Sequence, residues 1–347
     1  MNIDRLLEKN VVPDSLIRFG IRRLLRDRLR EEKKESPEAQ QKHRMELITK
    51  LRHSPIAVNT PDANTQHYEV PTDFFRFVLG PHMKYSCCYW TNSTPDLGSA
   101  EKAMLQLTCE RAELRDGQDI LELGCGWGSL TLFMAARYPN SRITAVSNSK
   151  TQKVYIDGQA SDRGLRNINV ITQDMNTFGM DRTFDRVVSI EMFEHMRNYQ
   201  RLLQNVAQWL KDDGKLFVHI FTHKEFSYLF EVNGETDWMS KYFFTGGIMP
   251  DDHLLLYFND ALKVEQHWRV SGTHYQETAE AWLRNMDNHR TDIMPIIAST
   301  YGNDQAKRWW AYWRVFFMAC AELWGHGNGE QWFVSHYLFN KTGATRQ

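Results

Sequence analysis

A glycine-rich turn, ELGCGWG at residues 122–128, constrains the fold of this chain more than any other feature. It follows the apolar run ILEL at 120–123 and precedes residues 129–138, whose apolar side chains recur at helical spacing. Glycine tolerates positive φ angles and lets the backbone approach a ligand, and the N-terminus of the next helix presents free N–H groups. The turn therefore predicts a strand–turn–helix unit that binds a ligand.

Beyond this turn, apolar runs typical of strands alternate with segments of helical periodicity. We expect strands at 142–149, 167–174, 184–193 and 215–221, helices at 129–138, 150–163 and 198–211, and near the end a helix at 304–324 and a strand at 332–339. Strands that alternate with helices of 10–15 residues predict an α/β fold with a doubly wound, mostly parallel sheet.

The turn differs from the fingerprint of nicotinamide- and flavin-binding folds in two respects. Its glycines follow the spacing G-x-G-x-G rather than G-x-G-x-x-G, and Glu122 lies two residues before the first of them. The next expected strand ends in Ser147-Asn148-Ser149, without the acidic residue about 20 residues on that would hold a nucleotide ribose. Asp174 follows the third strand, where a carboxylate can meet an adenine amino group.

The chain divides into four segments: a helical arm and linker at 1–66, a core at 67–223, an aromatic-rich insertion at 224–303, and a final helix and strand at 304–347. The arm is expected to contain two helices. The first spans 14–32, with Asp14 or Ser15 as its N-cap, and the second runs from Pro37 to about His53.

Composition limits the class of protein. With 42% hydrophobic and 24% charged residues the chain is not globally disordered, and its net charge of −1 excludes general affinity for nucleic acid. No apolar run approaches the roughly 20 residues of a membrane-spanning helix, and the start lacks the features of a secretory signal, so we expect a cytoplasmic protein. The five cysteines lack the spacing of a metal site, and we expect no metal.

The N-terminal arm is basic although the whole chain is nearly neutral. From Leu16 to Arg52 it has 12 Lys and Arg residues against 6 Asp and Glu residues. We expect its apolar stripe to pack on the body and its basic face to be solvated, because both helices are also rich in Glu. Contact with an anionic membrane surface, or exchange of the arm between the subunits of a homodimer, are the alternatives.

Several motifs together resemble the S-adenosylmethionine-dependent methyltransferases of the cyclopropane-fatty-acid synthase family. They are ELGCGWG, SNSKTQ at 147–152, SIEMFEHM at 189–196, HYEVPTDFF at 67–75, KYSCCYW at 84–90 and YFFTGGIMP at 242–250. The resemblance covers roughly residues 67–340 and is strongest to the coclaurine-type alkaloid N-methyltransferases of plants. It implies a Rossmann-like class I methyltransferase fold with an N-terminal helical arm and an inserted helical acceptor-binding subdomain.

The resemblance also implies where the cofactor, S-adenosylmethionine, and its product S-adenosylhomocysteine would bind. The methionine part would lie over Gly124, Gly126 and Gly128, its carboxylate end near Tyr85 and Ser86, the ribose near Asn148 and Gln152, and the adenine near Asp174 and Met175. Two of these residues have a structural alternative: Gly128 could serve only helix–sheet packing, and Met175 could be part of the core.

An acid–imidazole cluster, Glu191, Glu194 and His195, follows the fourth expected strand. If 191–196 is helical, its i,i+3 and i,i+4 spacings place all three side chains on one face. An alkyl amine is mostly protonated at neutral pH, so its methylation needs a base. We expect a carboxylate of the cluster to hold the ammonium form and the imidazole to accept its proton; the alternative is a helix-start acid beside a core histidine.

The lipid branch of the family offers a rival function. Its cyclopropane synthases hold a bicarbonate base through a set that matches Cys87, Glu194, His219 and Tyr275, whereas Glu191 replaces a small residue. An added carboxylate suits a cationic substrate, so the sequence favours N-methylation of a small cyclic or aromatic amine. Methylation or cyclopropanation of phospholipid acyl chains, S-methylation, and a non-catalytic cofactor-binding protein that acts through partners are the alternatives.

The acceptor pocket is expected to be aromatic. Its candidate residues are Trp238, Tyr242, Phe243 and Phe244 in the insertion and Trp309, Trp310, Trp313, Phe316 and Phe317 near the end. The second group recurs at helical spacing, which by itself indicates a core. The turn Thr245-Gly246-Gly247 is a candidate hinge for a lid over the site.

Overall fold

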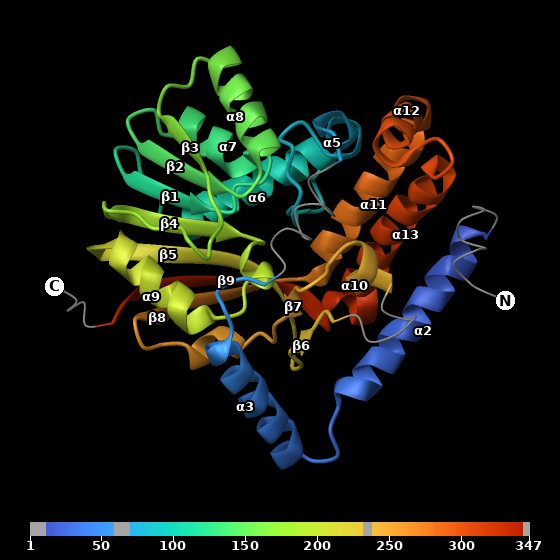
Figure 1. The fold of residues 1–347 in the computed structure, drawn as a ribbon, viewed down its shortest axis with the longest axis horizontal. Helices are drawn as coiled ribbons and strands as arrows, with labels where there is room; N and C mark the ends of the chain where they lie inside the picture. The colour runs from blue at the N-terminus through green and yellow to red at the C-terminus, as the bar shows by residue number, and fades with distance from the viewer. Residues whose placement is uncertain (1–11, 59–69, 232–237, 343–347) are drawn as a thin grey trace.

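The computed structural model describes residues 12–58, 70–231 and 238–342 (Figure 1). Its main sheet has the strand order β3-β2-β1-β4-β5-β9-β8. The strands are β1 (Asp119–Leu123), β2 (Arg142–Ser147), β3 (Ile168–Thr172), β4 (Phe184–Ile190), β5 (Leu210–His223), β8 (Leu262–Val270) and β9 (Trp332–Lys341). Strand β9 pairs antiparallel with both of its neighbours, and the other pairs are parallel. The predicted mostly parallel, doubly wound sheet is confirmed.

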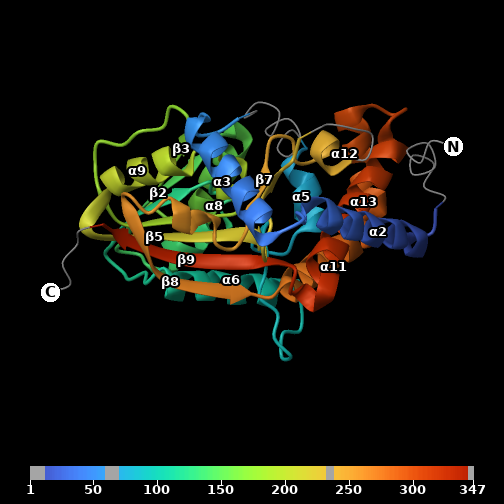
Figure 2. The ribbon, with the colours of Figure 1, turned by 90° about the horizontal axis from the view of Figure 1, so that it is seen from below.

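Helices cover both faces of this sheet because its strands are apolar on both sides. Along β1, Leu121 and Leu123 belong to a core cluster shared with α3 (Pro37–His53) and α9 (Tyr199–Trp209). Ile120 belongs to a cluster shared with α6 (Leu97–Arg111) and α7 (Ser129–Arg137), and α8 (Lys150–Asp162) packs beside β2 and β3. Figure 2 shows α3 and α9 above the sheet and α6 below it.

A helical layer stands beside the sheet (Figure 1). It contains α5 (Thr72–Val78), α10 (Trp238–Tyr242), α11 (Gly272–Asn288), α12 (Arg290–Tyr301) and α13 (Ala306–Gly325). The short pieces between these elements are β6 (Tyr228–Leu229), β7 (Ile248–Met249), η2 (Leu254–Tyr257) and η3 (His326–Gly329). The largest core cluster joins α5, α11 and α13. No helix among the described residues combines the length and apolarity that crossing a membrane requires.

The two helices of the arm have the predicted bounds, α2 (Asp14–Glu32) and α3. The predicted cap of α2 is wrong, because Pro13 is the N-cap and makes no side-chain bond. Asp14 instead binds Arg314 of α13 at 2.8 Å, an ion pair that fixes the start of the helix to the body. Residues 1–11 and 59–69 lie outside the described residues. They include most of the linker and the start of the HYEVPTDFF motif.

The region expected as an insertion, 224–303, does not form one body apart from the sheet. Strand β8 lies within it and pairs with β9 at the edge of the main sheet. Its sequence, LKVEQHWRV, exposes polar side chains along most of its length, as an edge strand can. The β6–β7 pair is a separate small sheet, yet Ile248 of β7 belongs to a core cluster of the main sheet.

Candidate active site

Two adjoining clefts open at the carboxyl ends of β1 and β4, where the strand order reverses direction. Such a switch point is where open α/β sheets bind ligands. Gly124, Gly126, Gln152 and Glu191 line both clefts. The first cleft, with about 780 Å³ of free space when the part open to solvent is included, is also lined by Asn148, Asp174, Met175 and His195. The second is also lined by Tyr85, Ser86 and Trp127.

The three glycines of the turn have different roles. All have positive φ angles, 78° at Gly124, 53° at Gly126 and 76° at Gly128. A Cβ on Gly126 would meet nothing within 4 Å, so this position faces open space in the cleft. A Cβ on Gly128 would lie 2.6 Å from the Ile156 side chain, and Gly128 lines neither cleft. The structure thus gives Gly128 the packing role that the sequence left as an alternative.

Gln152, in the wall of both clefts, has a hydrogen-bond donor without an acceptor among the described residues. Gln152 accepts a hydrogen bond from the Ser147 hydroxyl on its Oε1 atom, at 2.6 Å. Its Nε2 atom is buried and makes no hydrogen bond within the described residues. A buried donor without an acceptor costs about 1–3 kcal/mol, which an acceptor atom on a bound ligand would recover. Nearby, Asn148 is exposed and Asp174 is partly exposed, whereas Met175 is buried in a core cluster as well as lining the cleft.

The segment that carries Tyr85, Ser86 and Cys87 is held by two buried charged residues that sequence reasoning missed. The Glu101 carboxylate accepts hydrogen bonds from the backbone N–H groups of Gly80, His82 and Lys84, at 2.8 to 3.2 Å. The Lys84 ammonium in turn donates to the Cys87 carbonyl at 2.7 Å. Burial raises the pKa of Glu101 to about 7. Nothing in the sequence marks Glu101, which lies within a helix.

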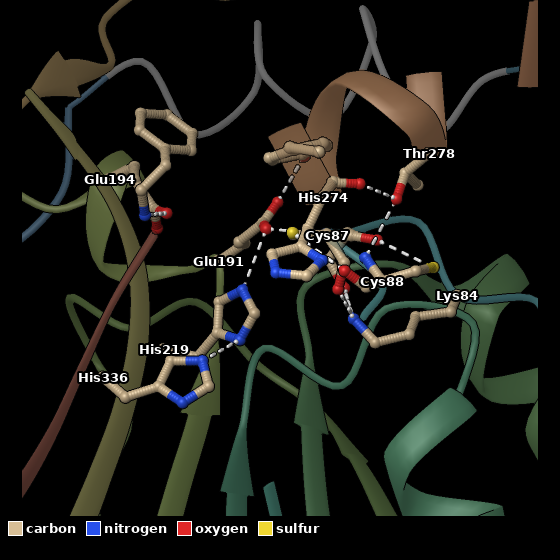
Figure 3. A network of polar contacts seen from close by, with 12 residues as sticks. Lys84, Cys87, Cys88, Glu191, Glu194, His219, His274, Thr278 and His336 are labelled. Atoms are coloured by element: carbon tan, nitrogen blue, oxygen red, sulfur yellow. Dashed lines mark hydrogen bonds and ion pairs between the residues drawn. The ribbon is translucent and has the colours of Figure 1, made fainter. Parts of the chain in front are cut away.

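Glu191 is the polar centre of the site. Its Oε1 atom lies 2.9 Å from the backbone nitrogen of Cys87 and 3.1 Å from Nε2 of His219. Its Oε2 atom accepts a hydrogen bond from the Tyr275 hydroxyl at 2.6 Å. Figure 3 shows the carboxylate between Cys87 and His219, which come from distant parts of the chain. Burial is the main influence on the Glu191 carboxyl and raises its pKa.

The condition under which the three cluster residues would share one face, a helix over 191–196, is not met. A 3₁₀ turn, η1, spans only Phe193–His195, and Glu191 precedes it with a φ of 47°. Figure 3 shows Glu194 apart from Glu191. Glu194 lines neither cleft; its Oε1 atom accepts the Phe221 N–H at 2.7 Å, and its Oε2 atom is buried without a partner in the described residues. Burial and the charge of Glu191 raise the pKa of Glu194 well above the usual range.

His195 lines the first cleft beside Glu191. Its ring lies 4.8 Å from the Phe244 ring, centroid to centroid. Burial lowers the pKa of the imidazole to about 4, so the ring is neutral at physiological pH. The Cys87 thiol also stays neutral, because burial raises its pKa well above the usual range, and its sulfur donates to the Cys88 carbonyl at 3.3 Å.

Most of the aromatic residues expected in the acceptor pocket are packed together instead. Trp238, Tyr242, Phe243, Trp309, Trp313 and Phe316 line neither of the two clefts and belong to, or pack against, the core cluster around α13. Phe243 stacks on Phe316 with a centroid distance of 4.4 Å. The Tyr275 ring, whose hydroxyl binds Glu191, stacks on Trp324, and ring contacts continue from Trp324 to Phe221 and from Phe221 to Phe244. Thr245 and Gly246, from the candidate hinge, line the first cleft.

Comparison with known proteins shows the family to which the chain belongs. The chain fits the model of the mycolic acid cyclopropane synthetases over residues 58–332. It belongs to that family. Within the family, an (S)-coclaurine N-methyltransferase of Thalictrum flavum subsp. glaucum is 41% identical over 339 residues, which cover 96% of this chain and 94% of the relative.

Two further relatives mark the two branches of the family. A crystal structure of coclaurine N-methyltransferase bound to N-methylheliamine and S-adenosylhomocysteine superposes with a TM-score of 0.94 and 40% identity, over 98% of this chain and 99% of that one. The cyclopropane-fatty-acyl-phospholipid synthase of Escherichia coli K12 is 31% identical over 258 residues, 74% of this chain and 62% of the relative. This family member is therefore an S-adenosylmethionine-dependent methyltransferase with the class I fold.

The residues present in the clefts fit S-adenosylmethionine. The open space above Gly126 suits close approach of the chain of the methionine part, and the unpaired Nε2 of Gln152 suits a hydroxyl or ring oxygen of the ribose. The described residues contain no group of three or more His, Cys, Asp and Glu side chains arranged to hold a metal ion.

Proposed function

We propose that the protein transfers the methyl group of S-adenosylmethionine to the nitrogen of a small cyclic or aromatic amine. The observation that carries the proposal is the Glu191 carboxylate, which lines both of the clefts that we assign to the cofactor and would therefore lie beside the bound cofactor. A carboxylate in that position attracts an ammonium group. The relatives that are named coclaurine N-methyltransferases, at about 40% identity over almost the whole chain, support the same substrate class.

The partners of Glu191 argue against the lipid alternative. In the cyclopropane synthases that the sequence resembles, the counterparts of Cys87, His219 and Tyr275 help to hold a bicarbonate base. Here all three contact the Glu191 carboxylate. The Glu191 carboxylate is thus the anion that these groups bind. A bicarbonate ion bound beside it would be repelled by its negative charge. An amine acceptor agrees with this arrangement better than an acyl chain does.

The pKa directions reverse the roles that we expected for the carboxylate and the imidazole. Burial raises the pKa of Glu191 and lowers that of His195 to about 4, so the carboxylate is the stronger proton acceptor. We assign to Glu191 both the ion pair with the incoming ammonium and the removal of its proton. His195 remains neutral and orients the nitrogen. Glu194, which lines neither cleft and accepts the Phe221 N–H, acts only by positioning this edge of β5.

When bound, S-adenosylmethionine supplies an electrophilic methyl group. The protein has to present an uncharged nitrogen to that group and keep water away. The rings of Phe244 and Phe221 next to His195 supply the apolar wall for this purpose. For the cofactor we retain Tyr85, Ser86, Gly124, Gly126, Asn148, Gln152, Asp174 and Met175 as the binding residues, all of which line one or both clefts.

Replacement of Glu191 tests the proposal directly. Glu191→Gln keeps the size of the side chain but removes its charge and its basicity, so kcat on a cyclic secondary amine should fall by roughly 100-fold or more. Binding of S-adenosylmethionine, measured by calorimetry, should stay within about threefold. Glu330→Gln, a change at an exposed glutamate remote from both clefts, is the matched control and should leave both quantities unchanged.

The pH profile gives a second readout. The pKa of Glu191 is raised above its ordinary value of 4.5. As pH falls, the carboxylate is therefore protonated at a higher pH than an ordinary glutamate is. kcat/KM should therefore show an acid limb above pH 4.5 that Glu191→Gln abolishes. A Glu191→Gln protein with the kcat of the parent, or with an unchanged acid limb, would contradict the role assigned to this residue.

A further inference from the structure

A chain of hydrogen bonds runs from the surface of the molecule to Glu191. Nη1 of Arg111 lies 2.8 Å from Nδ1 of His336, and Nε2 of His336 lies 2.9 Å from Nδ1 of His219. His219 then contacts Oε1 of Glu191 through Nε2 at 3.1 Å. Figure 3 shows His336, His219 and Glu191 in line. Both histidines are fully buried, whereas Arg111 is partly exposed.

The register of the sheet places the residues of this hydrogen-bonded row side by side. His219 on β5 and His336 on β9 are direct cross-strand partners, and Trp268 on β8 is the partner of His336 on the other side. The three side chains therefore form a row across adjacent strands. Arg111, the last residue of α6, lies over the Trp268 ring at 5.1 Å, which holds the guanidinium against the row.

The chemistry of arginine fixes the direction of every bond in the chain. A guanidinium has only donors, so Nδ1 of His336 has to be the acceptor. A neutral imidazole carries one proton, so Nε2 of His336 donates to Nδ1 of His219, and Nε2 of His219 donates to Glu191. Burial holds the pKa of both rings well below the ordinary value, which excludes the doubly protonated forms.

We propose that Arg111 is a positioning residue that selects the Nε2–H tautomer of both histidines and thereby directs a hydrogen-bond donor at the Glu191 carboxylate. Neither Arg111 nor His336 lines a cleft or contacts the reacting groups. The donor stabilises the ionised form of Glu191. If His336 carried its proton on Nδ1, an unprotonated His219 Nε2 would face the carboxylate and repel it.

The guanidinium also prevents proton transfer along this row of hydrogen bonds. A proton could leave Glu191 along the chain only if the far end could accept one, and a guanidinium cannot. The proton taken from the amine therefore leaves through the clefts and not through the sheet. The tautomers follow from the geometry alone, whereas the effect of Arg111 on turnover rests on the proposed function of Glu191.

Nitrogen NMR of the ¹⁵N-histidine-labelled full-length protein tests the tautomers without any acceptor. His336→Asn and His219→Asn spectra assign the two rings. We expect both rings of the parent protein to carry their proton on Nε2. In Arg111→Gln, whose side-chain amide can accept as well as donate, His336 should populate the Nδ1–H form. Arg111→Lys is donor-only and should keep the parent tautomer wherever it folds, and Arg137→Gln, at an exposed arginine that bonds Tyr138, should change neither ring.

Kinetics on an amine acceptor test the consequence. A hydrogen bond to a charged group is lost in Arg111→Gln, so kcat should fall roughly 10- to 100-fold with little change in the affinity for S-adenosylmethionine. Arg111→Lys should recover much of the loss. An Nδ1–H or doubly protonated ring in the parent spectrum overturns the proposal, and so does an Arg111→Gln protein with parental tautomers. If the parent protein methylates no amine but shows both Nε2–H rings, the proposed function fails and the tautomer assignment stands.

Discussion

At the scale of single residues, the site depends on a strained position. Glu191 has a φ of 47°, a left-handed conformation that residues with a Cβ seldom adopt. It follows directly on β4, and its N–H donates to the His219 carbonyl of β5 at 2.8 Å. Such strain persists where the surroundings over-determine the conformation. The backbone bond and the contacts from Cys87, His219 and Tyr275 together hold the carboxylate in its place.

The glycine turn offers a prediction at the same scale. Gly126→Ala would point a methyl group into the cleft, and we expect the Kd for S-adenosylhomocysteine to rise about tenfold while the free energy of unfolding falls by about 1 kcal/mol from the positive φ. Gly128→Ala adds a clash with Ile156, so the free energy of unfolding should fall by about 2–4 kcal/mol, with nearly unchanged affinity. Calorimetric titration and urea denaturation measure the two effects, and the reverse pattern would show that the roles of the glycines are exchanged.

The sequence indicates candidate residues for the site but not how they are arranged. Glu191, His195 and the glycine turn were identifiable because they are close in sequence to the ends of strands β1 and β4. The arrangement of Glu194 could not be predicted, because a face shared with Glu191 requires a helix where the backbone of Glu191 turns left-handed. Arg111 and His336 are 225 positions apart, and only the folded structure brings α6 against β9 and so joins them.

At the scale of elements, local periodicity predicted the parallel strands, the helices of the arm, the helices α7, α8 and α9 between the strands, and α13. It missed the edge of the sheet and the helices α5, α6, α10, α11 and α12. The helices α2 and α3 have the predicted bounds, because their apolar spacing and the Pro37 start are local signals. Strand β8 was missed, since it alternates poorly and its pairing partner β9 is about 70 residues away. The aromatic residues of α13 pack as their helical spacing indicates, with the majority buried.

Helix α3 gives a prediction for the stability of the arm. Ile48 is fully buried against the α9 side of the sheet, whereas Met45 on the same helix is 39% exposed. Ile48→Ala should lower the free energy of unfolding by about 2–4 kcal/mol, because it leaves a cavity in the core. Met45→Ala should change it by less than about 0.5 kcal/mol. Equal effects in urea denaturation would mean that α3 is not docked as the structure has it.

At the scale of the whole molecule, the arm joins the sheet and the helical layer. Arg18 of α2 contacts Glu280 of α11 and Glu322 of α13, at 2.5 and 3.1 Å, while α3 packs on α9 at the opposite end. Part of the apolar stripe packs on the body as expected, through Ile17, Ile21, Leu25 and Leu29. The basic face is not solvated throughout, because Arg18 belongs to it and is paired with the body. On the outer face of α2, Leu16, Phe19 and Leu24 are more than half exposed. Contact of this face with a membrane surface or a second subunit stays a prediction.

The placement of the site follows from the same architecture. The cofactor cleft lies at the carboxyl ends of β1 to β4, and Tyr275 of the helical layer completes the contacts of Glu191. Under the proposed function, substrate class is set where the two layers meet, while hydrogen bonds across the sheet link Arg111 to Glu191. The row across β5, β9 and β8 thus serves both the fold and the site.

The choice between amine and lipid is the most direct test of the role proposed for Glu191. The full-length protein would be incubated with methyl-labelled S-adenosylmethionine and two acceptor panels, cyclic secondary and tertiary amines and unsaturated phospholipid vesicles. We predict label on the nitrogen of amines, with at least a roughly 100-fold loss in Glu191→Gln. Label on the acyl chains alone would contradict the proposed function, and would mean that Glu191 serves the lipid chemistry of the family.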